Sequence, residues 1–334
     1  MQKIVVTPVK NESWILSLTL ACHSLWADKI IVADQKSDDN TREICLQFPK
    51  VQLIKNDSTQ FNEAERRQIL LNEVRKNNKN ALIFALDADE ILSAEALDNS
   101  FWQELSKKIH PGMSISMQWM QLWDGFETYN NSKTWRDKKV FAYYDDGVSN
   151  FGKGLMHLPR VPDSYLDNFI DIETPKVLHF QFVNLNRSQA KQRYYQVLDK
   201  VIGRVKNDFK NNFIYGVTKQ KPKLLPIPKK WLAGYLERGI NFSYDKKENT
   251  YWNKEIIKYF LKHTSKEFKW LDIWDIDWKK ETERLNLLNT GQGPFADPRG
   301  ITIKIYHRLQ KTELINTSLR NLMMYFFNTI KQGK

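Results

Sequence analysis

The first 90 residues alternate between two patterns of apolar and polar positions. Short and almost continuously apolar runs are typical of strands buried on both faces, and between them apolar residues recur at helical spacing. The strand-like runs cover 4–6, 29–33, 51–54 and 81–86, and the helix-like stretches cover 13–27, 41–48 and 62–77. This order predicts a parallel sheet with helices on both faces, in which ligands bind beyond the carboxyl ends of the strands.

The alternation becomes weaker after residue 92 and changes in character near 185. Three more strand-like runs precede the change, with a Gly-, Asp- and Pro-rich stretch among them, and helical patterns follow it, interrupted by a Lys/Pro-rich linker at 219–230. We therefore predict an α/β domain over 1–185, divided into 1–92 and 93–185, and a mostly α-helical region over 186–334.

Composition and charge exclude some classes of protein. Hydrophobic residues make up 41% of the chain, too many for a disordered protein. The net charge of +12 favours an anionic partner without choosing one, and we interpret the spread-out lysines as solvated faces. Two cysteines among apolar residues, no signal peptide and no apolar run of membrane-spanning length predict a cytoplasmic protein without disulfides.

An acidic motif, Asp87-Ala88-Asp89-Glu90, follows the apolar run at 81–86. Side chains two apart in an extended segment point the same way, so Asp87 and Asp89 would offer two carboxylates to Mn²⁺ or Mg²⁺. The spacing alone is weak evidence, because Asp275-Ile276-Asp277 repeats it between two tryptophans. Only the first pair ends a buried strand, and we interpret the second as surface decoration.

Two other strand ends carry polar side chains. Asp34 ends the run at 29–33 and could accept hydrogen bonds from a base or a ribose; the alternative is an Asx turn, with Asp39 or Thr41 capping the next helix. The loop 7–12 could hold a nucleoside through its backbone, Asn11 or Glu12, or could simply cap the following helix.

Arg67 falls on the predicted buried face of the helix over 62–77, so it needs a partner. A donor phosphate or Asp87 would satisfy it, and a structural salt bridge is the alternative. His179 lies inside the apolar run VLHFQF, where a lone histidine is more often a core residue than a ligand. His157 lies in a loop, and neither histidine has a neighbour at zinc spacing.

Four motifs in order give the stretch from Lys3 to Leu92 its resemblance to the nucleotide-binding half of a family 2 glycosyltransferase with the GT-A fold. They cover about a quarter of the chain. They are Lys10-Asn11-Glu12, the set Asp34, Ser37, Asp39 and Thr41, then Arg67, and last Asp87-Ala88-Asp89-Glu90. The resemblance makes 1–92 the nucleotide-sugar half and 93–185 the acceptor half.

The resemblance also implies roles for single residues. Asp34 would contact the base, Asp39 or Asn11 the nucleoside, Asp87 the ribose or the metal, and Asp89 the metal. His179 would be a further metal ligand, which makes that interpretation as strong as the core one. The donor-binding residues would be Pro8, Asn11, Glu12, Asp34, Asp39, Arg67, Asp87 and Ala88, and the metal ligands Asp87, Asp89 and His179.

The catalytic base is where the resemblance ends. Related enzymes often carry a His-Glu pair whose Glu is the base, and this chain has His157-Leu158. An inverting transfer needs a base within reach of the acceptor hydroxyl. Asp145, Asp146, Asp163 and Asp171 are available, and we choose Asp146 first and His157 second.

The resemblance therefore implies a metal-dependent, inverting glycosyltransferase that uses a nucleotide-sugar donor, with a UDP-sugar favoured. By analogy its acceptor is a glycan or lipid-linked glycan of a bacterial surface polymer. A sugar-nucleotide nucleotidyltransferase is one alternative, but it needs a Gly-rich loop and 7–12 has no glycine. The other is a basic nucleic-acid-binding protein, although we expect no nucleic-acid partner.

The basic, aromatic region beyond 185 would suit peripheral docking at the inner face of an anionic membrane. Plain helical packing is the alternative that we favour.

Overall fold

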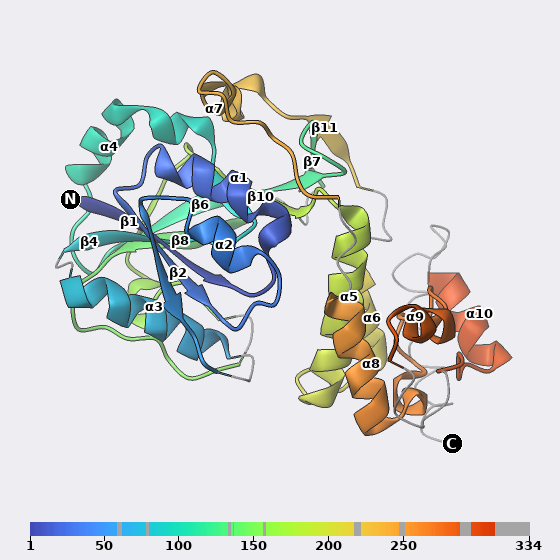
Figure 1. Ribbon diagram of the computed structural model, residues 1–334. Coiled ribbons are helices and arrows are strands. Elements are labelled where there is room, and N and C mark those ends of the chain that lie inside the picture. The colour runs from blue at the N-terminus through green and yellow to red at the C-terminus, as the bar shows by residue number, and fades with distance from the viewer. Residues whose placement is uncertain are drawn as a thin grey trace. The chain divides into compact units, whose positions relative to one another are not determined.

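The computed structural model describes most of the chain (Figure 1). The described residues are 1–58, 62–77, 80–132, 135, 137–155, 158–216, 222–246, 251–287 and 295–310. They form two compact units. The first comprises Met1–Asn184 and Pro222–Lys247, and the second comprises Leu185–Lys221 and Glu248–Lys334.

The first unit is built on the parallel strands that the apolar runs predict. β1 (Gln2–Val9) lies between β2 (Lys29–Asp34) and β4 (Ala81–Ala85), and β3 (Val51–Lys55) lies beyond β2. The apolar character of β1, β2 and β4 follows from burial on both faces, whereas β3 is only partly buried and carries Gln52 and Lys55.

Helices cover both faces of this sheet (Figure 1). Because successive side chains of a strand point to opposite faces, Ile4 packs with the apolar residues of α3 (Glu63–Asn77), and Val5 packs with those of α1 (Ser13–Ser24) and α4 (Asn99–Ser106). The short α2 (Thr41–Cys45) follows β2. The predicted α/β fold class is confirmed.

The second half of the sheet reverses direction. β8 (Lys138–Tyr144) lies between β4 and β6 (Ser114–Trp123) and is antiparallel to both. The carboxyl end of β8 therefore lies at the amino end of β4, where the Asp145 N–H donates to the carbonyl of Ala81 (3.0 Å). The remaining strands are β5 (Glu90–Leu92), β7 (Thr128–Asn130), β9 (Phe169–Asp171), β10 (Val177–Phe182) and β11 (Leu224–Pro226).

The prediction that everything beyond 185 forms the helical region is wrong for 222–247. β11 pairs with β7, and α7 (Ala233–Leu236) follows it. Trp231 and Tyr235 are buried against residues of α1, β5 and β10, and the Tyr235 hydroxyl donates to the carbonyl of Leu92 (2.9 Å). Burial of these aromatic rings, which the Lys/Pro-rich composition conceals, keeps the segment in the first unit.

The second unit is helical, as predicted. Its helices are α5 (Leu185–Val201), α6 (Asp208–Tyr215), α8 (Tyr251–His263), α9 (Trp278–Arg284) and α10 (Ile301–Gln310). The two aspartates of the second acidic motif, Asp275-Ile276-Asp277, have structural roles. Asp275 pairs with Arg193 (2.7 Å), and Asp277 caps α9 by accepting from the N–H groups of Lys279 and Lys280. The part of the predicted helical region beyond 310 lies outside the described residues.

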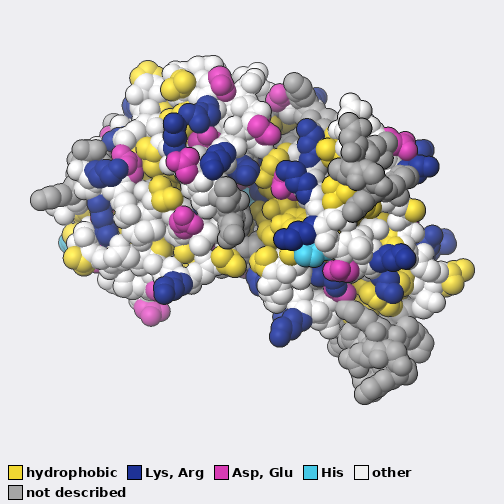
Figure 2. All heavy atoms as spheres, turned by 60° about the horizontal axis from the view of Figure 1, so that its bottom comes forward, with side chains coloured by type: hydrophobic (Ala, Val, Ile, Leu, Met, Phe, Trp, Pro, Cys, Tyr) yellow, Lys and Arg dark blue, Asp and Glu magenta, His cyan; other side chains and the backbone are white. Residues whose placement is uncertain are grey.

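None of the helices in the described part of the chain combines the length and the apolarity that crossing a bilayer requires. Lys and Arg side chains are dispersed over the face that Figure 2 shows, with acidic, hydrophobic and uncharged side chains between them.

Candidate functional site

The loops that carry the predicted donor residues meet where the parallel strands end. Val9 at the end of β1 lies opposite Asp34 at the end of β2. Val6 lies opposite Ala85, so the acidic motif after Ala85 runs alongside the last residues of β1. The structure thus brings Asn11, Asp34 and the acidic motif to one edge of the sheet, which is the edge where open α/β sheets bind ligands.

Hydrogen bonds join the loops after β1 and β2. The Asn11 side-chain oxygen accepts from the Asp38 N–H (2.9 Å), and the Ser37 hydroxyl accepts from the Asn11 N–H (2.9 Å). Asp34 accepts from the Ser37 N–H (3.1 Å), three residues on, which holds the loop that follows β2. Asn11 has φ 56°, a left-handed conformation that Asn tolerates better than most residues. These side chains preorganise the edge, and their contact with a donor stays a prediction.

Asp39 has a structural role, although the N-cap of α2 is Asn40, which makes no side-chain cap hydrogen bond. Its carboxylate accepts from the Thr41 N–H (3.0 Å) and from the Ser13 N–H at the start of α1 (3.1 Å). Glu12 accepts from the indole N–H of Trp14 (2.7 Å). Both acids therefore brace the loops. Pro8 lines a small pocket together with Arg67 and Asp87, and its contact with a donor stays a prediction.

The acidic motif forms a turn between β4 and β5, so the expectation of an extended segment is wrong. The Glu90 N–H donates to the carbonyl of Asp87 (3.1 Å), and Thr19 of α1 donates to the carbonyl of Ala88 (2.9 Å). As a result the two aspartates differ in environment: the Asp87 side chain is 45% exposed and that of Asp89 is buried.

Glu90 anchors this turn from inside the protein. Its fully buried carboxylate accepts from the Asp87 N–H (2.9 Å) and from the indole N–H of Trp119 (2.8 Å). A buried carboxylate also needs a positive partner, and no motif in the sequence indicates one for Glu90.

Arg160 is that partner, and it is a residue of this site that no sequence motif predicted. Its guanidinium donates to Glu90 (2.9 Å), to Asp87 (2.9 Å) and to the carbonyl of Ala85 (3.2 Å). It also lies over the ring of Phe141, 4.9 Å from the centroid. Arg160 comes from the loop 145–162, whose composition shows only that it is a loop, so no sequence pattern identified the residue.

Positive charge surrounds the motif. Burial raises the pKa of Glu90, and Arg160 offsets only part of that effect. Burial alone would lower the pKa of Arg160, but Asp87 and Glu90 outweigh it and raise that pKa. Burial, followed by repulsion from Arg160, lowers the pKa of both Arg67 and Lys139. Cations that repel one another favour an anionic ligand between them.

Asp89 and His179, two of the three predicted metal ligands, lie side by side. The His179 Nε2 is 3.5 Å from the Asp89 Oδ1, and both side chains are buried. The His179 ring stacks on Trp119 (centroids 4.7 Å apart), and its Nδ1 is 2.6 Å from the Gln121 side-chain oxygen. Packing and this hydrogen bond fix the ring.

The hydrogen bond to Gln121 also decides which nitrogen faces Asp89. If Nδ1 donates to the Gln121 oxygen, the neutral ring presents the lone pair of Nε2 to a carboxylate oxygen. Two acceptors at this distance repel each other unless a proton or a cation lies between them. A metal-ligating histidine typically has its second nitrogen bound in this way, so the pair fits a divalent cation. Asp87 pairs instead with Arg160, and the described residues contain no group of three or more acidic, histidine or cysteine side chains able to hold a metal.

Arg67 acts on the loop that carries Arg160. Its guanidinium donates to the carbonyls of Leu158 (3.0 Å) and Pro159, and it forms an ion pair with Glu63 (3.6 Å). The structural alternative is therefore present, in the form of a loop anchor. Arg67 also lines the pocket with Asp87, so donor contact stays a prediction.

Asp146, chosen as the catalytic base, lies at the wrong edge of the sheet. Because β8 is antiparallel to β4, Asp146 follows the strand at the end opposite to the acidic motif. Its carboxylate accepts from the N–H groups of Val148 and Ser149 (both 2.8 Å), which with the Ser149 hydroxyl lower its pKa despite partial burial. Arg75 pairs with the neighbouring Asp145 (2.7 Å). An acid held in its charged form by these donors is also a weak base. His157, the second choice, lies outside the described residues.

A comparison with protein families agrees with the resemblance carried by the motifs. Residues 4–102 match the family model described as glycosyl transferase family 2. No curated protein matches the chain.

Several solved structures are similar over part of the chain. A 4-diphosphocytidyl-2C-methyl-D-erythritol synthase shares 12% identity over 43% of this chain and 71% of its own, with a TM-score of 0.27. A glucosyl-3-phosphoglycerate synthase from Mycobacterium tuberculosis shares 16% identity over 36% of this chain and 44% of its own (TM-score 0.25). A mannose-1-phosphate geranyltransferase from Thermus thermophilus shares 10% over 44% and 56% (TM-score 0.28).

Proposed function

We propose that this protein is a metal-dependent glycosyltransferase. It moves a sugar from a nucleoside-diphosphate donor, with a UDP-sugar favoured, to a hydroxyl of a glycan or lipid-linked glycan of a bacterial surface polymer, with inversion. The observation that carries the proposal is the pair formed by Asp89, on the turn after β4, and His179 of β10, in a chain whose residues 4–102 match glycosyl transferase family 2.

Asp89 and His179 are the protein groups that would hold the Mn²⁺ or Mg²⁺. Two protein ligands are enough for an ion whose other positions are taken by donor phosphates and water. When bound, the ion supplies positive charge to the diphosphate as the bond to the sugar breaks. Asp87, which is half exposed and oriented by Arg160, is available to the ribose or to the ion's outer shell.

Arg160 and Lys139 support the same step from the protein side. Lys139 lies over Trp119, 3.9 Å from the ring centroid, and Trp119 in turn stacks on His179. Fixed cations near a developing diphosphate lower the barrier without reorganising during the reaction. Arg160 is additionally needed to keep the acidic turn in place.

We assign the role of base to Asp137 instead of Asp146. Asp137 directly precedes β8, whose amino end lies at the edge where β4 ends. The backbone carbonyl of Asp137 accepts from the backbone N–H of Trp119 (3.0 Å). Asp137 is exposed, and its charge, like those of Glu90 and Asp87, partly offsets the lowering of the pKa of Lys139. An exposed acid at the ligand edge can reach an acceptor hydroxyl.

The direct test is thermal stabilisation by UDP, GDP and nucleotide sugars, with and without Mn²⁺. A ligand at one hundred times its Kd stabilises a protein by about 2.7 kcal/mol, which corresponds to a Tm several degrees higher. We expect this rise with nucleotide plus metal, and expect it to vanish in Asp89→Ala and His179→Ala.

The matched control is Asp277→Ser, which changes the repeated acidic spacing but keeps a helix cap on α9. It should respond to ligands like the unaltered protein. No nucleotide response at saturating metal in the unaltered protein would rule out the proposed function.

A further inference from the structure

The excess positive charge of the protein belongs entirely to the helical unit. The sheet unit, Met1–Asn184 with Pro222–Lys247, contains 27 Lys and Arg residues and 27 Asp and Glu residues. The helical unit contains 24 Lys and Arg residues against 12 Asp and Glu residues, so it carries the whole net charge of +12. An anionic partner would therefore be attracted to the helical unit.

Within this unit, one face of α10 is firmly held. Ile303 and Tyr306 are buried with Phe209 and Trp270, and the rings of Tyr306 and Phe209 are 4.8 Å apart. His307, also buried, lies 3.1 Å from the carbonyl of Trp270 through its Nε2.

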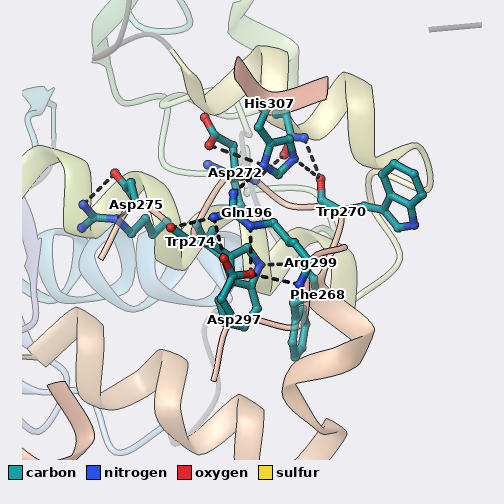
Figure 3. Close-up of polar contacts among 12 residues, drawn as sticks. Gln196, Phe268, Trp270, Asp272, Trp274, Asp275, Asp297, Arg299 and His307 are labelled. Carbon is teal, nitrogen blue, oxygen red and sulfur yellow. Dashed lines mark hydrogen bonds and ion pairs between the residues drawn. The ribbon is translucent and has the colours of Figure 1, made fainter. Parts of the chain in front are cut away.

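A polar network completes this attachment (Figure 3). The Arg299 guanidinium lies 2.9 Å from the His307 Nδ1, donates to the carbonyl of Trp274 (2.9 Å) and pairs with Asp297 (2.9 Å). The helix is thus fixed in rotation about its own axis, and its opposite face must point away from this core.

The opposite face combines apolar and basic side chains. We call it the outer face of α10, and its members are Ile301, Lys304, Ile305 and Arg308. Their spacing of i, i+3, i+4 and i+7 places them on one stripe of the helix. Ile301 is 77% exposed and Ile305 is 51% exposed, and both basic residues are exposed as well.

This arrangement is unusual within the described part of the chain. Among its exposed large hydrophobic residues, Ile301 and Ile305 are the pair that one helical turn separates. Aliphatic side chains flanked by cations are the pattern of a helix that lies in a bilayer interface, with its apolar atoms in the acyl boundary and its cations at the headgroups.

Nucleic acid fits the same charge less well. Proteins that bind single strands stack successive bases on several exposed aromatic rings. Phe260, Trp270, Trp274 and Trp278 of this unit are buried, and Phe213 of α6, which is 61% exposed, is the one exposed aromatic ring among the unit's described residues. Exposed isoleucines gain nothing from a phosphate backbone but gain apolar burial in a lipid interface.

We propose that the outer face of α10 docks the protein on an anionic lipid bilayer. The chemistry that it recognises is a negatively charged headgroup layer above an acyl boundary. Such docking would hold the enzyme at the surface that carries a lipid-linked acceptor, and in this respect the proposal rests on the proposed function.

The test is co-sedimentation of the full chain with vesicles of phosphatidylcholine alone and of phosphatidylcholine with about one third phosphatidylglycerol. We expect binding to the anionic vesicles that weakens as NaCl rises from about 0.05 to about 0.5 M. In Ile301→Ser/Ile305→Ser and in Lys304→Glu/Arg308→Glu, the partition coefficient should fall on the order of tenfold or more.

Two controls match these variants. Lys279→Glu/Lys280→Glu changes the charge of the same unit equally at the exposed start of α9, and Leu46→Ser removes a residue that is 76% exposed in the sheet unit. Both should bind the anionic vesicles within about twofold of the unaltered protein.

The proposal would be overturned if Lys279→Glu/Lys280→Glu lost as much vesicle binding as Lys304→Glu/Arg308→Glu. Equal binding of the unaltered protein to both kinds of vesicle would also overturn it. A DNA duplex bound more tightly than the anionic vesicles, with the same dependence on Lys304 and Arg308, would overturn it in favour of nucleic acid. Nucleotide stabilisation with Mn²⁺ is measured without lipid, so failure of the docking proposal is distinguishable from failure of the proposed function.

Discussion

Arg160 connects the buried Glu90 to the exposed Asp87, and this makes it the residue on which the acidic turn depends most. Removing one member of a buried ion pair leaves an uncompensated charge, which typically costs about 3–5 kcal/mol. We therefore expect Arg160→Met to lower the free energy of unfolding by about 3–5 kcal/mol at pH 7, measured by urea denaturation.

The pH dependence of this loss follows from the pKa of Glu90. Burial raises that pKa, so the protonated form is favoured in the folded state, and stability falls as pH rises through the folded pKa. Without Arg160 the pKa of Glu90 should be raised further. The free energy of unfolding that Arg160→Met loses should therefore become smaller towards acid pH. Arg160→Met/Glu90→Gln should recover much of the stability at pH 7, and no recovery would mean that Arg160 acts through another contact.

Asp137 and Asp146 offer a matched pair for identifying the base. Asn preserves the shape of Asp and removes the basic oxygen. We expect Asp137→Asn to reduce kcat on the order of 100-fold or more with little change in nucleotide binding, because general base catalysis contributes about that much. Asp146→Asn should leave kcat within a few-fold. Steady-state kinetics with a UDP-sugar would measure both, and the reverse ranking would restore Asp146.

At the scale of elements, the segment 222–247 forms part of the sheet unit despite its distance in sequence. Tyr235 is fully buried among residues of α1, β5 and β10. Loss of such a side chain leaves a cavity, and Phe or Trp truncations cost about 3–5 kcal/mol. Tyr235→Ala should lower the free energy of unfolding by about this amount, as measured by urea denaturation. Leu236→Ala, at the next residue but 54% exposed, should change it by less than about 0.5 kcal/mol.

Hydrophobic patterning predicted those elements whose burial is visible locally. The runs 4–6, 29–33 and 81–86 are apolar because both faces of β1, β2 and β4 are covered, and their carboxyl ends placed Asp34 and Asp89 correctly. Strand direction leaves no such mark. The run that became β8 reads the same in either direction, so Asp146 was assigned to the wrong edge.

Long-range partners were also invisible in the sequence. The partner of Glu90 is 70 residues away along the chain, in a loop of unremarkable composition. The need for a cation was predictable from the burial of an acid, but the choice of Arg160 depends on how the loop 145–162 folds back, held by Arg67. His179 was predicted as a metal ligand only through the family resemblance, because its place in an apolar strand by itself favoured a core residue.

At the scale of the whole molecule, the two units should respond to different conditions. The sheet unit has equal numbers of acidic and basic residues and holds the proposed donor site, whereas the helical unit carries the net charge of +12. Salt screens repulsion among like charges, so it should stabilise the helical unit more than the sheet unit. Calorimetry should therefore resolve two transitions, one raised by NaCl and the other raised by UDP with Mn²⁺.

Asp89→Ala separates these two effects. It should abolish the shift caused by UDP with Mn²⁺ and leave the shift caused by NaCl unchanged, because Asp89 belongs to the sheet unit alone. A single transition that moves with both ligand and salt would show that the two units unfold together. The free energy of nucleotide binding would then stabilise the helical unit as well. Lipid bound at α10 would raise the affinity for the nucleotide only if it also changed the conformation of the folded sheet unit.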